Sequence, residues 1–173
     1  GLTGNVTITA DNDITIEDLS DDELLFATGT NVSFIADADG NGSGNFSMNL
    51  DDTIRAEQGD IAISAVNITA GTIDTSTNAQ DPGGNGSITG GNSTLAATGN
   101  IVGDEILTYG YRNIGPQHSA NGGNVSLTTT GGSVTINSHI DSSSIIDGRR
   151  AGDGGNIAIE ARDDIQMGVM PPV

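Results

Sequence analysis

Residues 121–140 read NGGNVSLTTTGGSVTINSHI. After a Gly-Gly-Asn turn, apolar and polar residues alternate through Val125 and Leu127, and after Gly131-Gly132 they alternate again through Val134 and Ile136. A period of two predicts a strand with one buried face. The β-branched residues favour strands, and the glycines supply the backbone angles of turns. This stretch therefore predicts a strand, a turn and a second strand.

The same pattern recurs along the chain. Its copies are GNVTITADNDITI from Gly4, GNFSMNLDDTI from Gly44, GDIAISAVNITAGTI from Gly59, GNGSITGGNSTLAATGNIV from Gly84 and GGNIAIEARDDIQM from Gly154. An imperfect repeat that recurs along the whole chain indicates repeat units stacked on one another. We expect one apolar residue of each copy to fill a comparable interior position: Val6, Phe46, Ile88, Val125 and Ile157.

The composition favours a narrow interior. The chain has 173 residues, which suggests one domain, and it has 26 glycines but only 3% aromatic residues. Large aromatic side chains supply much of the buried area of an ordinary core. Here layers of Ile, Val, Leu and Ala must replace them, as in a solenoid.

The fold prediction is an all-β, right-handed parallel β-helix formed by residues 1–173. The alternative is an antiparallel β-sandwich, in which residues 130–133 make a tight hairpin turn that pairs Thr128 with Ser133. The Gly-Asn openings recur with one chain polarity, which favours the solenoid. With roughly 20–25 residues per coil, about seven or eight coils would form.

The net charge of −18 excludes a nucleic-acid partner, because phosphates would be repelled. Acidic residues keep a repetitive β protein soluble and also attract divalent cations. There is no cysteine, so the chain has no disulfide and no thiolate metal site. No stretch approaches the ~20 apolar residues of a membrane helix, and no membrane insertion is expected.

Residues 37–45, DADGNGSGN, contain the pattern of a calcium loop. Asp37, Asp39 and Asn41 occupy positions 1, 3 and 5, and Gly42 follows at position 6. Position 12 is Met48 instead of the bidentate Glu. The sequence thus predicts calcium as a candidate cofactor on Asp37, Asp39 and Asn41, with a polar turn between strands as the alternative.

Three segments interrupt the repeats near residues 17–26, 105–119 and 141–154. The first, EDLSDDELLF, has some helical character; the others read EILTYGYRNIGPQHS and DSSSIIDGRRAGDG. Groups that stack and donate hydrogen bonds gather in the second: Tyr109, Tyr111, Arg112 and His118. They form the predicted contact surface, and the alternative is that the tyrosines pack on the flank of the solenoid.

No arrangement of residues typical of catalysis is found. Adjacent acids occur at Asp21-Asp22, Asp51-Asp52 and Asp163-Asp164, but neighbours on a strand point to opposite faces. The prediction is a protein without enzymatic activity, with a polysaccharide-cleaving β-helix as one alternative. The chain also holds eight Asn-x-Ser/Thr sequons, which we interpret as turn asparagines that precede strands.

The stretches GGNVSLTTTGGSVTI and GDGGNIAIEARDDI resemble the repeats of the bacterial filamentous haemagglutinin family, especially its Gly-Asn-rich large exoproteins common in cyanobacteria. The resemblance implies a parallel β-helix that an outer-membrane partner exports by two-partner secretion. It also implies adhesion or a surface fibre, with a secreted or cell-surface location.

From this resemblance we expect a structural and adhesive segment of a longer shaft, with a calcium-stabilised matrix protein as a further alternative. The repeat text at the start of the chain and Pro171-Pro172 near its end favour a fragment. The expected partners are a glycan or protein on a host or neighbouring cell, or other copies of the chain joined end to end.

Overall fold

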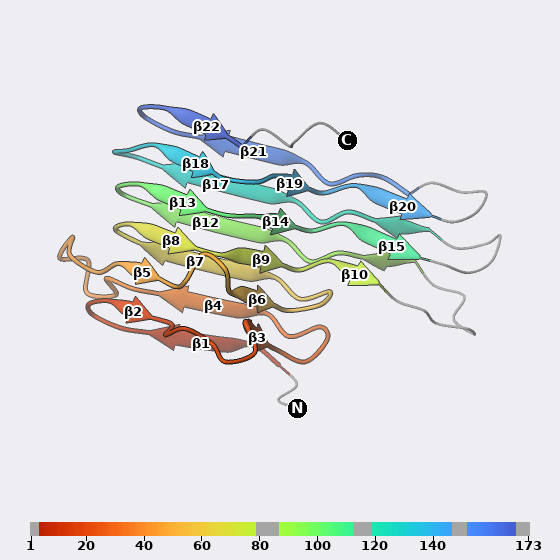
Figure 1. Ribbon diagram of the computed structural model, residues 1–173, viewed down its shortest axis with the longest axis horizontal. Helices are drawn as coiled ribbons and strands as arrows, with labels where there is room; N and C mark the ends of the chain where they lie inside the picture. Colours follow the sequence, from red (N-terminus) through yellow and green to blue (C-terminus); the bar gives the residue numbers. More distant parts are fainter. Residues whose placement is uncertain (1–3, 79–86, 113–118, 147–151, 169–173) are drawn as a thin grey trace.

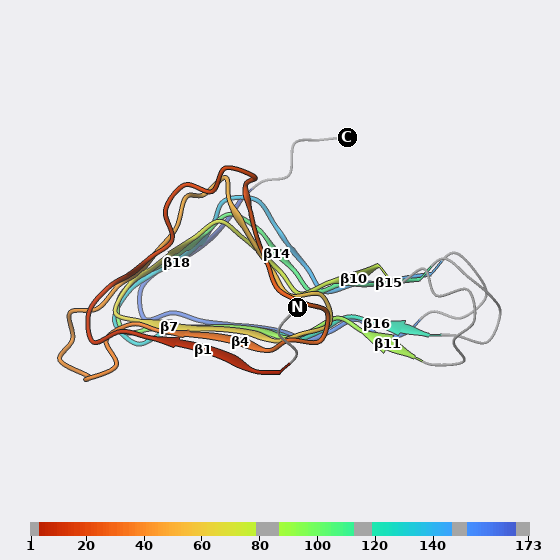
Figure 2. The ribbon, with the colours of Figure 1, turned by 90° about the horizontal axis from the view of Figure 1, so that it is seen from below.

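The structure is a computed structural model that describes residues 4–78, 87–112, 119–146 and 152–168. These residues form a parallel β-solenoid. Each complete turn of the chain places one strand in each of three sheets, so the turns stack along one axis (Figure 1) and enclose a triangular interior (Figure 2). Every strand pair in the described residues is parallel, and no helix occurs among them.

Two of the three sheets have six strands. Sheet A contains β1 (Val6–Thr9), β4 (Val32–Ile35), β7 (Ile61–Ala65), β12 (Ser93–Ala97), β17 (Val125–Thr129) and β21 (Ile157–Glu160). Sheet B contains β2 (Ile14–Thr15), β5 (Phe46–Ser47), β8 (Ile68–Ala70), β13 (Ile101–Gly103), β18 (Val134–Ile136) and β22 (Ile165–Met167).

Sheet C closes the triangle with five strands: β3 (Glu23–Leu25), β6 (Thr53–Arg55), β9 (Thr72–Asp74), β14 (Ile106–Leu107) and β19 (Ile140–Asp141). Two smaller sheets lie to one side of it. One contains β10 (Thr77–Asn78), β15 (Gly110–Arg112) and β20 (Ser144–Ile146), and the other contains β11 (Ile88–Thr89) and β16 (Ala120–Asn121).

The core consists of stacked columns of apolar side chains. In β17, Val125 and Leu127 are buried while Ser126 between them is not, as the alternation predicts. The interior column that contains Leu127 runs through the neighbouring strands by register pairing with Leu95 and Ile159. Burying each such side chain stabilises the fold by about 1.5–3 kcal/mol.

An asparagine ladder at the start of sheet A explains most of the Gly-Asn repeats. The side-chain oxygen of Asn92 accepts the backbone N–H of Asn124 at 2.9 Å, and Asn124 in turn accepts the N–H of Asn156 at 2.9 Å. The full ladder, joined by bonds of this kind or between side chains, is Asn5, Asn31, Asp60, Asn92, Asn124 and Asn156. The ladder fixes the register at the corner where each turn enters sheet A.

A second ladder stands at the entrance to sheet B. Asn67 accepts the backbone N–H of Asn100 at 2.9 Å, and Asn100 accepts that of Ser133 at 2.9 Å. Its members are Asp13, Asn45, Asn67, Asn100, Ser133 and Asp164. Six of the eight sequon asparagines thus belong to the two ladders, which accounts for their position in the repeat without a glycan.

The residue before each ladder position in sheet A is commonly glycine because successive turns touch there. A Cβ atom on Gly91 would lie 2.0 Å from the carbonyl oxygen of Gly59, and one on Gly123 would lie 1.9 Å from that of Gly91. Gly155 repeats this contact with Gly123 at 1.8 Å. Any side chain would push the turns apart, so the glycine of the Gly-Asn pair is a packing requirement.

The structure confirms the parallel β-helix over the antiparallel sandwich: residues 130–133 form a corner, and the strands around it pair with other turns. The expected helical character of residues 17–26 is wrong, because the segment contains β3. The coils are also longer than 20–25 residues, since successive ladder residues are 26, 29 and then 32 positions apart. Fewer coils therefore form than the seven or eight expected.

The expected column of interior residues also needs correction. Val6, Val125 and Ile157 do share sheet A, but Ile157, on the last strand, is 47% exposed. Phe46 lies in sheet B, and its ring packs against that of Phe34 from sheet A, with centroids 5.3 Å apart. Ile88 belongs to β11, outside the triangle. The reason is that Gly-Asn pairs precede strands of both sheet A and sheet B. Similar sequences therefore do not always occupy the same position in a turn.

Candidate functional site

A fin projects from the corner between sheets C and A (Figure 2). The fin consists of residues 75–78, 87–91, 108–112, 119–122, 142–146 and 152–154. In three successive turns the chain leaves the triangle along β10, β15 or β20 and later returns to sheet A. The described parts of the interruptions expected near residues 105–119 and 141–154 thus belong to successive turns of one structure, and residues 75–78 and 87–91 supply a third.

Close backbone contacts join the outgoing strands of the fin to its returning strands. A Cβ atom on Gly110 would lie 2.3 Å from the carbonyl oxygen of Asn121, and one on Gly90 would lie 2.1 Å from that of Thr108. At the base, buried hydroxyl groups bridge the layers. Thr75 donates to the carbonyl oxygen of Gly91 at 2.6 Å, and Thr108 repeats the bond one turn later at 2.8 Å. The fin is therefore thin and hydrogen-bonded from outgoing to returning strands.

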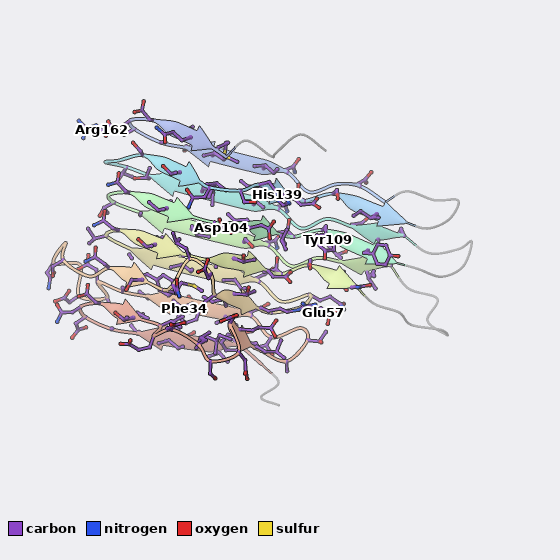
Figure 3. All side chains as sticks on the ribbon, viewed as in Figure 1. Phe34, Glu57, Asp104, Tyr109, His139 and Arg162 are labelled. Atoms are coloured by element: carbon purple, nitrogen blue, oxygen red, sulfur yellow. The ribbon has the colours of Figure 1, made fainter. Side chains whose placement is uncertain are left out.

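The lower edge of the fin is capped by Glu57, which lies on the turn below (Figure 3). Its Oε1 atom lies 3.3 Å from the backbone nitrogen of Asn78 and 3.4 Å from the Thr77 hydroxyl. Since β10 is an edge strand, its outward N–H groups need a partner. The carboxylate supplies one acceptor for them.

Tyr109 and Tyr111 lie on the outer face of the fin. They flank Gly110, whose missing Cβ atom would point at Asn121 on the returning strand, so by alternation both tyrosines project the other way. Each is half-buried. Tyr111 pairs in register with Asn78 below and Ile145 above, and Ile145 is 42% exposed.

These neighbours extend the predicted contact surface across three turns. Sequence reasoning did not find Asn78 or Ile145, because they come from other interruptions; aligning the three loops on each other would have found them. Arg112 is the last residue of β15, and the structure does not describe its side chain. His118 lies outside the described residues. The contact surface thus stays a prediction, now centred on Tyr109, Tyr111 and Ile145.

The predicted calcium loop is a tight turn between β4 and β5. Both carboxylate oxygens of Asp37 accept the backbone N–H of Gly42, at 2.9 and 3.1 Å, and Asp39 accepts bonds from the backbone and the side chain of Asn41. Asp37, Gly40 and Gly42 adopt left-handed backbone angles, with φ of 59°, 70° and 82°. These bonds account for the loop's shape, and the calcium prediction on Asp37, Asp39 and Asn41 remains a prediction.

Successive turns stack so that three parallel sheets enclose a narrow interior, and side-chain ladders join the turns at two corners. These features place the chain in the class of parallel β-solenoids. No protein-family model, curated protein or solved structure matches it. A membrane-spanning helix needs about 20 apolar residues, and the part of the chain that the structure describes forms none.

Proposed function

We propose that this chain is a structural and adhesive segment of a secreted bacterial cell-surface or extracellular-matrix protein, which acts as a scaffold and contact surface without turnover. The observation that carries the proposal is the fin, in which three stacked turns project from the solenoid. Tyr109, Tyr111 and Ile145 lie on this projection. Aromatic groups on a rigid support bind at a low cost in conformational entropy.

The proposed partner is a glycan or protein on a host or neighbouring cell. Tyrosine fits both, because its ring stacks on apolar surface and its hydroxyl group forms hydrogen bonds. A net charge of −18 disfavours anionic partners such as nucleic acid. Export through an outer-membrane partner is proposed from the resemblance of the Gly-Asn-rich repeats to the filamentous haemagglutinin family.

The test compares the protein with a double variant, Tyr109→Ser/Tyr111→Ser, in attachment of protein-coated beads to cells. We expect attachment to be lost while the circular dichroism spectrum and the unfolding midpoint stay unchanged. Ile35→Ser is the matched control, because Ile35 is a half-buried apolar residue on the outer side of sheet A, away from the fin. If the double variant still attaches, or if it unfolds, the contact surface is wrong.

The absence of turnover needs a separate assay. Incubation with acidic polysaccharides is expected to release no new reducing ends and no unsaturated product. Product formation that scales with protein concentration would replace the scaffold proposal with an enzyme. Sedimentation velocity of the same samples shows whether copies of the chain associate.

A further inference from the structure

One corner of the solenoid gathers carboxyl groups from two successive turns. Asp18 and Asp22 lie between β2 and β3, and Asp52 occupies the equivalent corner one turn later, between β5 and β6. One carboxylate oxygen from each of the three lies within 4.8 Å of the other two. Strand register causes this meeting: Glu23 pairs with Thr53, and the Asp22 carbonyl oxygen accepts the Thr53 N–H at 2.8 Å.

Asp52 is the unusual member of the group. It is fully buried, with 0% of its surface exposed. Its Oδ2 atom lies 3.3 Å from the backbone nitrogen of Leu19, while its Oδ1 atom has no hydrogen-bond partner within the described residues. A buried carboxylate oxygen without a partner is costly, so such a group calls for a ligand.

Among the residues that the structure describes, no basic side chain forms an ion pair with these three carboxylates. The ion pairs found among the described residues join Arg55 to Asp74 and His139 to Glu105, and neither involves Asp18, Asp22 or Asp52. Asp18 and Asp22 are exposed, so solvent reaches the cluster from outside. An ion can therefore enter from that side, and water can complete its coordination.

We propose that Asp18, Asp22 and Asp52 bind one Ca²⁺ ion, which joins the first two turns of the solenoid. The donors are all oxygen atoms, as hard divalent cations require. Ca²⁺ binds oxygen at about 2.3–2.6 Å, so two of its ligands lie at most about 5.2 Å apart, and the three oxygens, all within 4.8 Å of one another, are close enough to share one ion. Mg²⁺ usually keeps several waters and is bound by only one or two carboxylates, so a group of three carboxylates suits Ca²⁺ better.

This site is distinct from the Asp37, Asp39 and Asn41 loop, and it does not depend on the proposed function. In the loop the carboxylates accept hydrogen bonds from the loop's own backbone. In the cluster one buried oxygen of Asp52 lacks any such bond. The two sites therefore make separate predictions for calcium binding.

The chain offers a charge-matched control for the test. Asp18→Asn/Asp22→Asn removes two exposed ligands, and Asn tolerates the left-handed backbone of Asp22, whose φ is 55°. Asp21→Asn/Asp51→Asn removes the same charge from the adjacent exposed positions of the same two corners. Asp37→Asn/Asp39→Asn reports on the loop.

Equilibrium dialysis and calorimetry with CaCl₂ measure binding, and melting in CaCl₂ or EDTA measures stabilisation. We expect one Ca²⁺ per chain at this site, a midpoint that rises with calcium, and affinity weakened by at least about an order of magnitude in Asp18→Asn/Asp22→Asn alone. Equal calcium binding by the two charge-matched variants would overturn the proposal. So would the absence of calcium binding by the unaltered chain, or Mg²⁺ affinity equal to that for Ca²⁺.

Discussion

The side-chain oxygen of Asn92 lies 2.9 Å from the backbone nitrogen of Asn124, which is 32 residues further along the chain and one turn away. Asn92 also accepts a bond from the Asn124 side chain at 3.1 Å and donates one to Asp60 at 3.0 Å. One asparagine thus connects three turns at the corner where sheet A begins.

Replacing this asparagine removes all three bonds. Asn92→Ala is expected to lower the free energy of unfolding by about 1–2 kcal/mol, because the Asn124 N–H loses its acceptor. Urea unfolding followed by circular dichroism measures the change. Asn137→Ala is the control, since Asn137 is an exposed asparagine outside both ladders; equal effects of the two substitutions would show that the ladder adds no stability.

The close contact of Gly123 with Gly91 predicts that Gly123→Ala destabilises the protein more than Asn92→Ala does, although it adds only one methyl group. A single methyl group in Gly123→Ala would stand 1.9 Å from the Gly91 carbonyl oxygen, and a backbone atom cannot rotate away. We expect destabilisation above the roughly 1–3 kcal/mol typical of an overpacked side chain. The control is Gly154→Ala, where the nearest atom is 3.4 Å away and stability should not change. Wild-type stability of Gly123→Ala would mean that the turns are not in contact there.

The core prediction concerns Leu127, which is fully buried on β17 of sheet A, between β12 and β21. Leu127→Asp should cost several kcal/mol, because it places an unpaired charge in the interior. Ser126→Asp puts the same charge on the outer face next to Thr94 and Ala158, and it should leave the unfolding midpoint nearly unchanged. Similar midpoints for the two variants would place Leu127 outside the core.

The edge of the fin can be tested without any ligand. Glu57→Ala removes the acceptor of the Asn78 N–H and should speed its hydrogen exchange, with a loss of only about 0.5–1.5 kcal/mol in local stability. Exchange measured by NMR at Asn78 and at Leu127 separates local from global opening. Glu17→Ala, at an exposed position outside the fin, is the control. Unchanged exchange at Asn78 would show that Glu57 does not cap β10.

Sequence reasoning predicted the strands more accurately than the turns. The alternation in residues 125–129 identified β17 and its buried residues, and recurring Gly-Asn text identified parallel stacking. It did not reveal the length of a turn, because Gly-Asn pairs open both sheet A and sheet B. It also assigned helical character to residues 17–26, where pairing of β3 with β6 outweighs the local preference.

The amino-acid sequence by itself determined which residues alternate, where the chain must turn, and that apolar side chains too small for a broad core would fill narrow layers. Only the tertiary structure decided which turns lie side by side. The fin arises because three loops leave the same corner, and Asp22 meets Asp52 because β3 and β6 pair in register. Which residues meet across neighbouring turns depends on the total number of residues in the irregular corners between them. A local sequence pattern does not give that number.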